Sequence, residues 1–96
     1  ALERHRRYLS RMQVLSRLAG EIAINISVDH SVNGIGTYQR LIDVGYRLIE
    51  MGAGVIILGC AGMSRHRLKL EAELGIPVID PTQAAVSMAI GTILLK

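Results

Sequence analysis

Two short aliphatic runs constrain the fold of this chain most. Residues 55–58 (VIIL) form a continuous apolar run, which is typical of a strand buried on both faces. Residues 76–79 (IPVI) form a second short run between Gly75 and Asp80. The segments around both runs carry apolar residues at helical spacing. Short strands that alternate with helices predict a parallel sheet with helices on both faces.

The rest of the chain predicts four helices and one more strand. We expect helices over residues 2–18, 38–51, 64–74 and 81–95. Residues 22–28 (IAINISV) alternate and include β-branched residues, so we expect a strand there. The polar and glycine-rich stretch that follows it, DHSVNGIG, is typical of a loop.

Residues at the helix ends support these boundaries. Glycine, which can adopt the positive φ that ends a helix, follows three of them: Gly20, Gly52 and Gly75. Thr37 is expected to cap the second helix, and Asp80, Pro81 and Gln83 give the last helix a strong start. The predicted order is α-β-α-β-α-β-α. The fold class is therefore α/β, a three-layer α/β/α arrangement with a short parallel sheet.

The composition is that of one small folded domain. Half of the 96 residues are hydrophobic, so we expect residues 1–96 to fold as a single domain. One cysteine cannot form an internal disulfide, which favours a reducing compartment such as the cytoplasm. No signal peptide is visible, and no apolar run is long enough to cross a bilayer.

The positive charge is concentrated near the N-terminus. Residues 1–20 hold five Arg and one Glu, whereas the rest of the chain holds six basic and seven acidic residues. A basic helix can bind nucleic acid or a membrane. No aromatic or glycine-rich RNA-binding element accompanies these arginines, so we interpret them as the solvated face of a surface helix. We expect neither a nucleic-acid nor a membrane partner.

The single cysteine, Cys60, lies where a ligand site is expected. In open α/β sheets ligands bind beyond the C-terminal ends of the strands, and Cys60 follows the 55–58 run directly. The first N–H groups of the next helix have no intrahelical partner and favour a thiolate. Gly59 and Gly62 let the backbone approach a ligand closely. The competing interpretation is a buried, inert cysteine.

A resemblance favours the first interpretation. Residues 52–89, with the motifs GCAGM and PVID, resemble the C-terminal part of the aspartate/glutamate/hydantoin racemase superfamily. The hydantoin and allantoin racemase branch is the most similar. Residues 1–51 fit the same topology with weaker signals. The resemblance implies that the chain is a C-terminal α/β lobe of a two-lobed protein.

The resemblance also implies a reaction. Racemases of this kind work without a cofactor on amino acids or their derivatives, with two cysteines on opposite sides of the substrate. One thiolate removes the proton next to a carbonyl, and the other thiol returns a proton to the opposite face. Cys60 matches the second cysteine. Ala61 and Gly62 match the backbone donors that hold the substrate, and Gly59 and Met63 flank them as further substrate-binding residues.

This chain departs from the family pattern, because the lobe that carries the first cysteine is absent. We therefore expect a racemase fragment that is inactive alone, unless a second copy of the chain or a separate N-terminal lobe completes it. Exposed sheet edges also favour pairing with another chain. Two alternatives stay open. One is a cysteine-dependent decarboxylase or isomerase of the same superfamily, and the other is a non-catalytic module that binds small anions.

Other polar residues have simpler explanations. Asp29 and His30 fit an exposed loop, and His66 fits an exposed helix surface between two arginines. Asp80 is explained by capping, although Pro81 and Thr82 beside it are placed to line a site. The three histidines and one cysteine lack the spacing of metal ligands.

Overall fold

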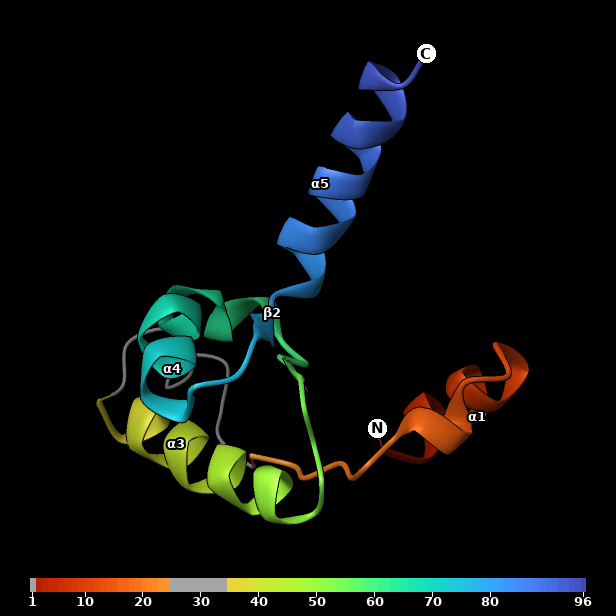
Figure 1. Ribbon diagram of the computed structural model, residues 1–96. Helices are drawn as coiled ribbons and strands as arrows, with labels where there is room; N and C mark the ends of the chain where they lie inside the picture. Colours follow the sequence, from red (N-terminus) through yellow and green to blue (C-terminus); the bar gives the residue numbers. More distant parts are fainter. Residues whose placement is uncertain (1, 25–34) are drawn as a thin grey trace.

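The computed structural model describes residues 2–24 and 35–96, which form a small mixed α/β unit (Figure 1). The described residues contain four α-helices and one two-stranded parallel sheet. In chain order the elements are α1 (Leu2–Arg11), the 3₁₀ helix η1 (Leu15–Arg17), α3 (Ile35–Glu50), β1 (Ile56–Ile57), the 3₁₀ helix η2 (Ala61–His66), α4 (Arg67–Leu74), β2 (Val78–Ile79) and α5 (Pro81–Leu94). None of the helices in these ranges has the length and apolar character needed to span a membrane.

The two apolar runs form the parallel sheet that the sequence predicts. Ile56 pairs with Val78 and Ile57 with Ile79. The Ile56 N–H donates to the Pro77 carbonyl at 3.0 Å, and the Leu58 N–H donates to the Ile79 carbonyl at 2.9 Å. Both strands are shorter than the predicted runs, since each is assigned only two residues.

Side chains of α4 close the outer edge of β2. The Val78 N–H donates to Glu71 Oε1 at 2.8 Å, and Arg67 Nη1 donates to the Val78 carbonyl at 3.3 Å. Arg67 and Glu71 also lie 3.8 Å apart as an ion pair. These contacts satisfy the two backbone groups of Val78 that point away from β1. Any further strand must therefore join the sheet at β1.

One face of the sheet carries the core. Ile56, Leu58 and Val78 are buried there against α3 and α4, whose buried contributions are Leu41, Leu70 and Leu74. A Cβ on Gly45 would lie 2.5 Å from Leu74 Cδ1, so this glycine lets α3 approach α4 closely.

Two tyrosines of α3 form hydrogen bonds with backbone carbonyls of α4. The Tyr38 hydroxyl donates to the Lys69 carbonyl at 3.3 Å, and the Tyr46 hydroxyl donates to the Glu73 carbonyl at 3.2 Å. Desolvation and the nearby Glu73 carboxylate raise the pKa of Tyr46, so its hydroxyl stays protonated and remains a donor. Both bonds hold α3 alongside α4 over the same face of the sheet.

The opposite face of the sheet is bare, which contradicts the prediction of helices on both faces. Its side chains are largely exposed: Val55 at 51%, Ile57 at 69% and Ile79 at 36%. α5, the helix that follows β2, points away from the body of the molecule (Figure 1). The third predicted strand is not formed at residues 22–24, and residues 25–28 lie outside the described ranges.

Several predicted boundaries are confirmed and others are wrong. Gly52 and Gly75 adopt positive φ, at 100° and 73°; Gly52 is the second residue after α3, and Gly75 directly follows α4. Asp80 caps α5 by accepting the Thr82 N–H at 3.3 Å. Thr37 is the third residue of α3 and not its cap, because the helix begins at Ile35.

The N-terminal helix is shorter than predicted. Instead of running to residue 18, α1 ends at Arg11, because Gln13 adopts φ 60° and breaks the regular bonding before η1. The helix predicted to begin near Ser64 starts with the tighter turns of η2 and becomes α-helical at Arg67.

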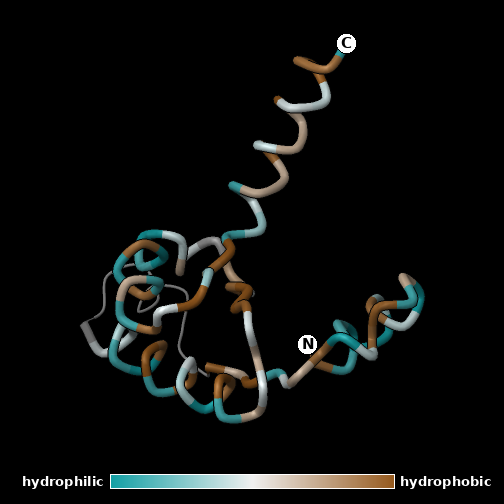
Figure 2. The backbone as a smooth tube through the Cα atoms, viewed as in Figure 1, coloured by the Kyte–Doolittle hydropathy of each residue, from teal (hydrophilic) through white to brown (hydrophobic). Residues whose placement is uncertain are grey.

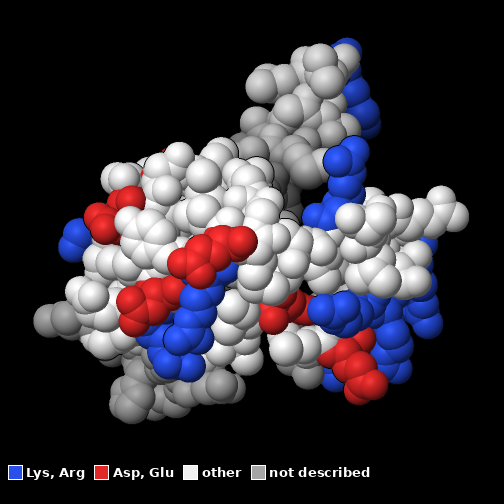
Figure 3. Space-filling view, turned by 60° about the horizontal axis from the view of Figure 1, so that its bottom comes forward, with Lys and Arg blue, Asp and Glu red and all other residues white. Residues whose placement is uncertain are grey.

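The arginines of α1 are exposed, as predicted for a solvated face. Basic side chains gather on the part of the surface that α1 forms (Figure 3). Arg4, Arg7 and Arg11 line a shallow hollow of about 170 Å³ together with Tyr8.

The burial pattern of α4 predicts unequal effects for two leucines of one helix. Leu70 is 1% exposed and Leu68 is 68% exposed. We expect Leu70→Ala to lower the free energy of unfolding by about 2–5 kcal/mol, because it opens a cavity in the core. Leu68→Ala should change it by less than about 0.5 kcal/mol. Urea unfolding followed by circular dichroism measures both, and equal losses would contradict this core.

Candidate functional site

Cys60 lies immediately after β1, where the chain turns into η2. Its backbone is extended (φ −145°, ψ 134°), and it occupies the N-cap position of η2. Its side chain makes no capping hydrogen bond there and is half-buried. The buried Leu58, two residues earlier, fixes the strand end that carries the sulfur. The core therefore fixes the position of Cys60, although the side chain itself is only half-buried.

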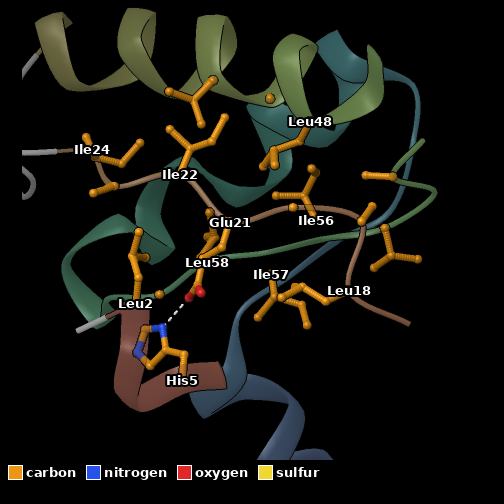
Figure 4. A pocket seen from close by; sticks show the side chains of 18 of the residues that line it. Leu2, His5, Leu18, Glu21, Ile22, Ile24, Leu48, Ile56, Ile57 and Leu58 are labelled. Carbon is orange, nitrogen blue, oxygen red and sulfur yellow. Dashed lines mark hydrogen bonds and ion pairs between the residues drawn. The ribbon is translucent and has the colours of Figure 1, made fainter. Parts of the chain in front are cut away.

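Cys60 lines a cavity of about 860 Å³ between the sheet, α3 and the N-terminal segment (Figure 4). Most of the walls are aliphatic, including Leu2 and Leu18 from the N-terminal segment and Leu48 from α3. Gly59, Met63 and Pro81 line the same cavity. Cys60 is half-buried and contributes to the wall of this cavity.

The backbone after Cys60 supplies hydrogen-bond donors. Ala61 and Gly62 open η2, and the first N–H groups of a helix have no carbonyl partner within it. The Met63 N–H instead donates to the Cys60 carbonyl at 3.0 Å. Met63 therefore offers a ligand its half-buried side chain, which packs against the core and reaches the cavity.

Gly59 faces open space. A Cβ built on it would meet no atom within 4 Å, and its φ lies outside the left-handed region. Neither packing nor backbone conformation among the described residues requires glycine at this position. Close approach of a ligand to the backbone would explain why residue 59 is a glycine.

The structure adds a polar pair that the sequence did not indicate. His5 of α1 and Glu21 are joined through Nδ1 and Oε2 at the wall of the same cavity (Figure 4). The two residues are 16 positions apart, and no motif connects them. Only the fold of the N-terminal segment back toward the sheet brings them together.

The remaining candidates have structural roles or lie elsewhere. Asp80 lies at the edge of the site and is buried. Its carboxylate already accepts the Thr82 N–H and caps α5. The prediction that His66 is exposed is wrong, because it is 9% exposed and stacks on Tyr38 with ring centroids 5.8 Å apart. Asp29 and His30 lie outside the described residues. Within residues 2–24 and 35–96 no three His, Cys, Asp or Glu side chains gather as metal ligands would.

Comparison with known proteins identifies relatives of this chain. The profile of the Asp/Glu/hydantoin racemase family matches residues 1–89. A hydantoin racemase of Paenarthrobacter aurescens is 55% identical over 40 residues, which are 42% of this chain and 17% of that protein. A hydantoin racemase of Pseudomonas sp. (strain NS671) is 50% identical over 52 residues, which are 53% of this chain and 21% of that protein.

A further relative has no assigned function. An uncharacterized protein of Schizosaccharomyces pombe is 54% identical over 41 residues, 41% of this chain and 17% of that protein. The matched stretches therefore cover only about a fifth of the length of these relatives. No solved structure matches the chain.

The position of Cys60 predicts a thiol that reacts in the folded chain. We expect a disulfide reagent such as dithiodipyridine to label one thiol per chain without denaturant, because the sulfur lines an open cavity. Cys60→Ser is the control and should show no labelling. Labelling that begins only when urea unfolds the chain would contradict the placement.

Proposed function

The chain belongs to the Asp/Glu/hydantoin racemase family, and from that premise we propose that it is part of a cofactor-independent racemase that acts on amino acids or hydantoin-type derivatives. The observation that carries the proposal is the position of Cys60. Cys60 lies between a buried strand end and the first N–H groups of η2, at the wall of an open cavity. The matched hydantoin racemases support the substrate class.

In the proposed reaction Cys60 transfers one proton. As a thiolate it takes the proton from the carbon next to a carbonyl and becomes a thiol. The electron pair of the broken C–H bond moves onto the carbonyl oxygen, which gains negative charge. The N–H groups of Ala61 and Gly62 stabilise that charge. The aliphatic walls suit the hydrocarbon substituent of the substrate.

Inversion needs a second acid on the opposite face of the substrate. The chain holds one cysteine, and its matches cover only about a fifth of these relatives, so we propose that another polypeptide segment supplies this group. We further propose that this α/β unit is part of the C-terminal lobe of a two-lobed racemase.

A single base predicts a measurable partial reaction. Cys60 can remove a proton from one face and return a deuteron from solvent to the same face. We expect the chain in deuterium oxide to exchange the proton of one enantiomer of a substituted hydantoin without loss of optical rotation. The rate should exceed the protein-free rate by at least about a hundredfold, the typical contribution of general acid–base catalysis. Proton NMR follows the exchange, and polarimetry follows the rotation.

Matched variants make this test specific. Cys60→Ala and Cys60→Ser should reduce exchange to the protein-free rate. Gly59→Ala should slow exchange while leaving the urea midpoint unchanged, because its methyl group enters ligand space and meets no protein atom. Exchange that persists undiminished in Cys60→Ala would overturn the proposed role of this residue.

A further inference from the structure

Glu21 places a carboxylate in a largely aliphatic wall of the cavity beside Cys60. Residues 18–24 (LAGEIAI) contain no other polar side chain, and Figure 2 shows this segment as largely hydrophobic. The Glu21 side chain is only 19% exposed. Carboxylates are rarely this buried unless surrounding groups donate hydrogen bonds to them. The proton transfer proposed for Cys60 gives this carboxylate no role.

The two oxygens of the Glu21 carboxylate differ in their surroundings. Oε2 is joined to His5 Nδ1 at the cavity wall (Figure 4). Oε1 is buried and accepts no hydrogen bond from any residue within 2–24 or 35–96. A buried acceptor without a donor is unfavourable, because it has lost its bonds to water without replacement. Oε1 therefore calls for a donor that this part of the chain does not supply.

Contacts with α3 hold the segment that carries Glu21. On one side of Glu21, a Cβ on Gly20 would collide with the Met51 side chain, so the backbone lies close against the residue that follows α3. On the other side, Arg40 Nε of α3 donates to the Ile24 carbonyl at 2.6 Å. Glu21 lies between these two contacts. Its carboxylate is therefore presented to the cavity from a backbone that is fixed at both ends.

We propose that Glu21 Oε1 accepts a hydrogen bond from an N–H group of the substrate and so selects hydantoin-type rings over dicarboxylates. The inference rests on the proposed function, because the same cavity has to hold the substrate beside Cys60. An ionised carboxylate can only accept hydrogen bonds, and a hydantoin ring carries N–H donors. An ionised dicarboxylate offers it no donor. Glu21 is then a binding residue that sets specificity, whereas Cys60 moves the proton.

Ligand binding to a chain that cannot react tests the proposal. On a Cys60→Ala background, NMR titration gives dissociation constants for isobutylhydantoin and for its N,N′-dimethyl derivative, which lacks N–H groups. We expect the dimethyl compound to bind at least about tenfold more weakly, because it leaves Oε1 without a donor. Glu21→Leu should weaken the binding of isobutylhydantoin at least about tenfold without weakening that of the dimethyl compound. Retained binding of the dimethyl compound also shows that the variant keeps its cavity.

Glu3→Leu is the matched control, because Glu3 is exposed on α1 and does not line the cavity. It should leave both dissociation constants unchanged. Equal affinity of the two compounds for the Cys60→Ala chain would overturn the proposal, whether or not Glu21→Leu folds. Methylsuccinate binding as tightly as isobutylhydantoin, or no binding of isobutylhydantoin, would also overturn it. The role of Cys60 fails separately, because deuterium exchange tests it and binding to the Cys60→Ala chain does not depend on it.

Discussion

The packing of one sheet face against α3 and α4 is the interaction on which the rest of this structure depends. Leu58, Leu70 and Val78 are almost fully buried there, and the two strands are too short to persist without that cover. The Arg67 and Glu71 contacts to Val78 add hydrogen bonds that complete the edge of β2. Cys60 inherits its position from this arrangement, because Leu58 fixes the strand end two residues before it.

The burial is one-sided, and this explains the unusual surface of the chain. Strands read as continuous apolar runs when both of their faces are buried. Here Ile56 and Val78 point into the core, while their neighbours Ile57 and Ile79 are exposed. The sequence is thus that of a fully covered sheet, whereas α3 and α4 cover only half of it. α5 likewise carries exposed apolar side chains, among them Val86, Ile90 and Ile93.

Local chemistry made part of the fold predictable. Gly52, Gly75 and Asp80 act through their own backbone or through a neighbour two residues away, so the sequence alone places them correctly. The burial of His66 depends on Tyr38, which lies on a different helix, and the His5–Glu21 pair depends on how the N-terminal segment returns to the sheet. Such contacts leave no periodic or spaced signal in the sequence. The direction of α5 also escaped prediction, because propensity fixes the helix but not what it packs against.

The site shows the same division between local and distant causes. Residues 59–63 contain a thiol directly after a strand, a glycine with open space beside it and the start of a 3₁₀ helix, all of which can be recognised from the local sequence. These features create one reactive face. The proposed racemisation needs a reactive group on each of two faces of the substrate. A parallel sheet of this kind also needs packing on both of its faces. The cavity beside Cys60 opens between the sheet, α3 and the N-terminal segment, so whatever packs there controls access to Cys60.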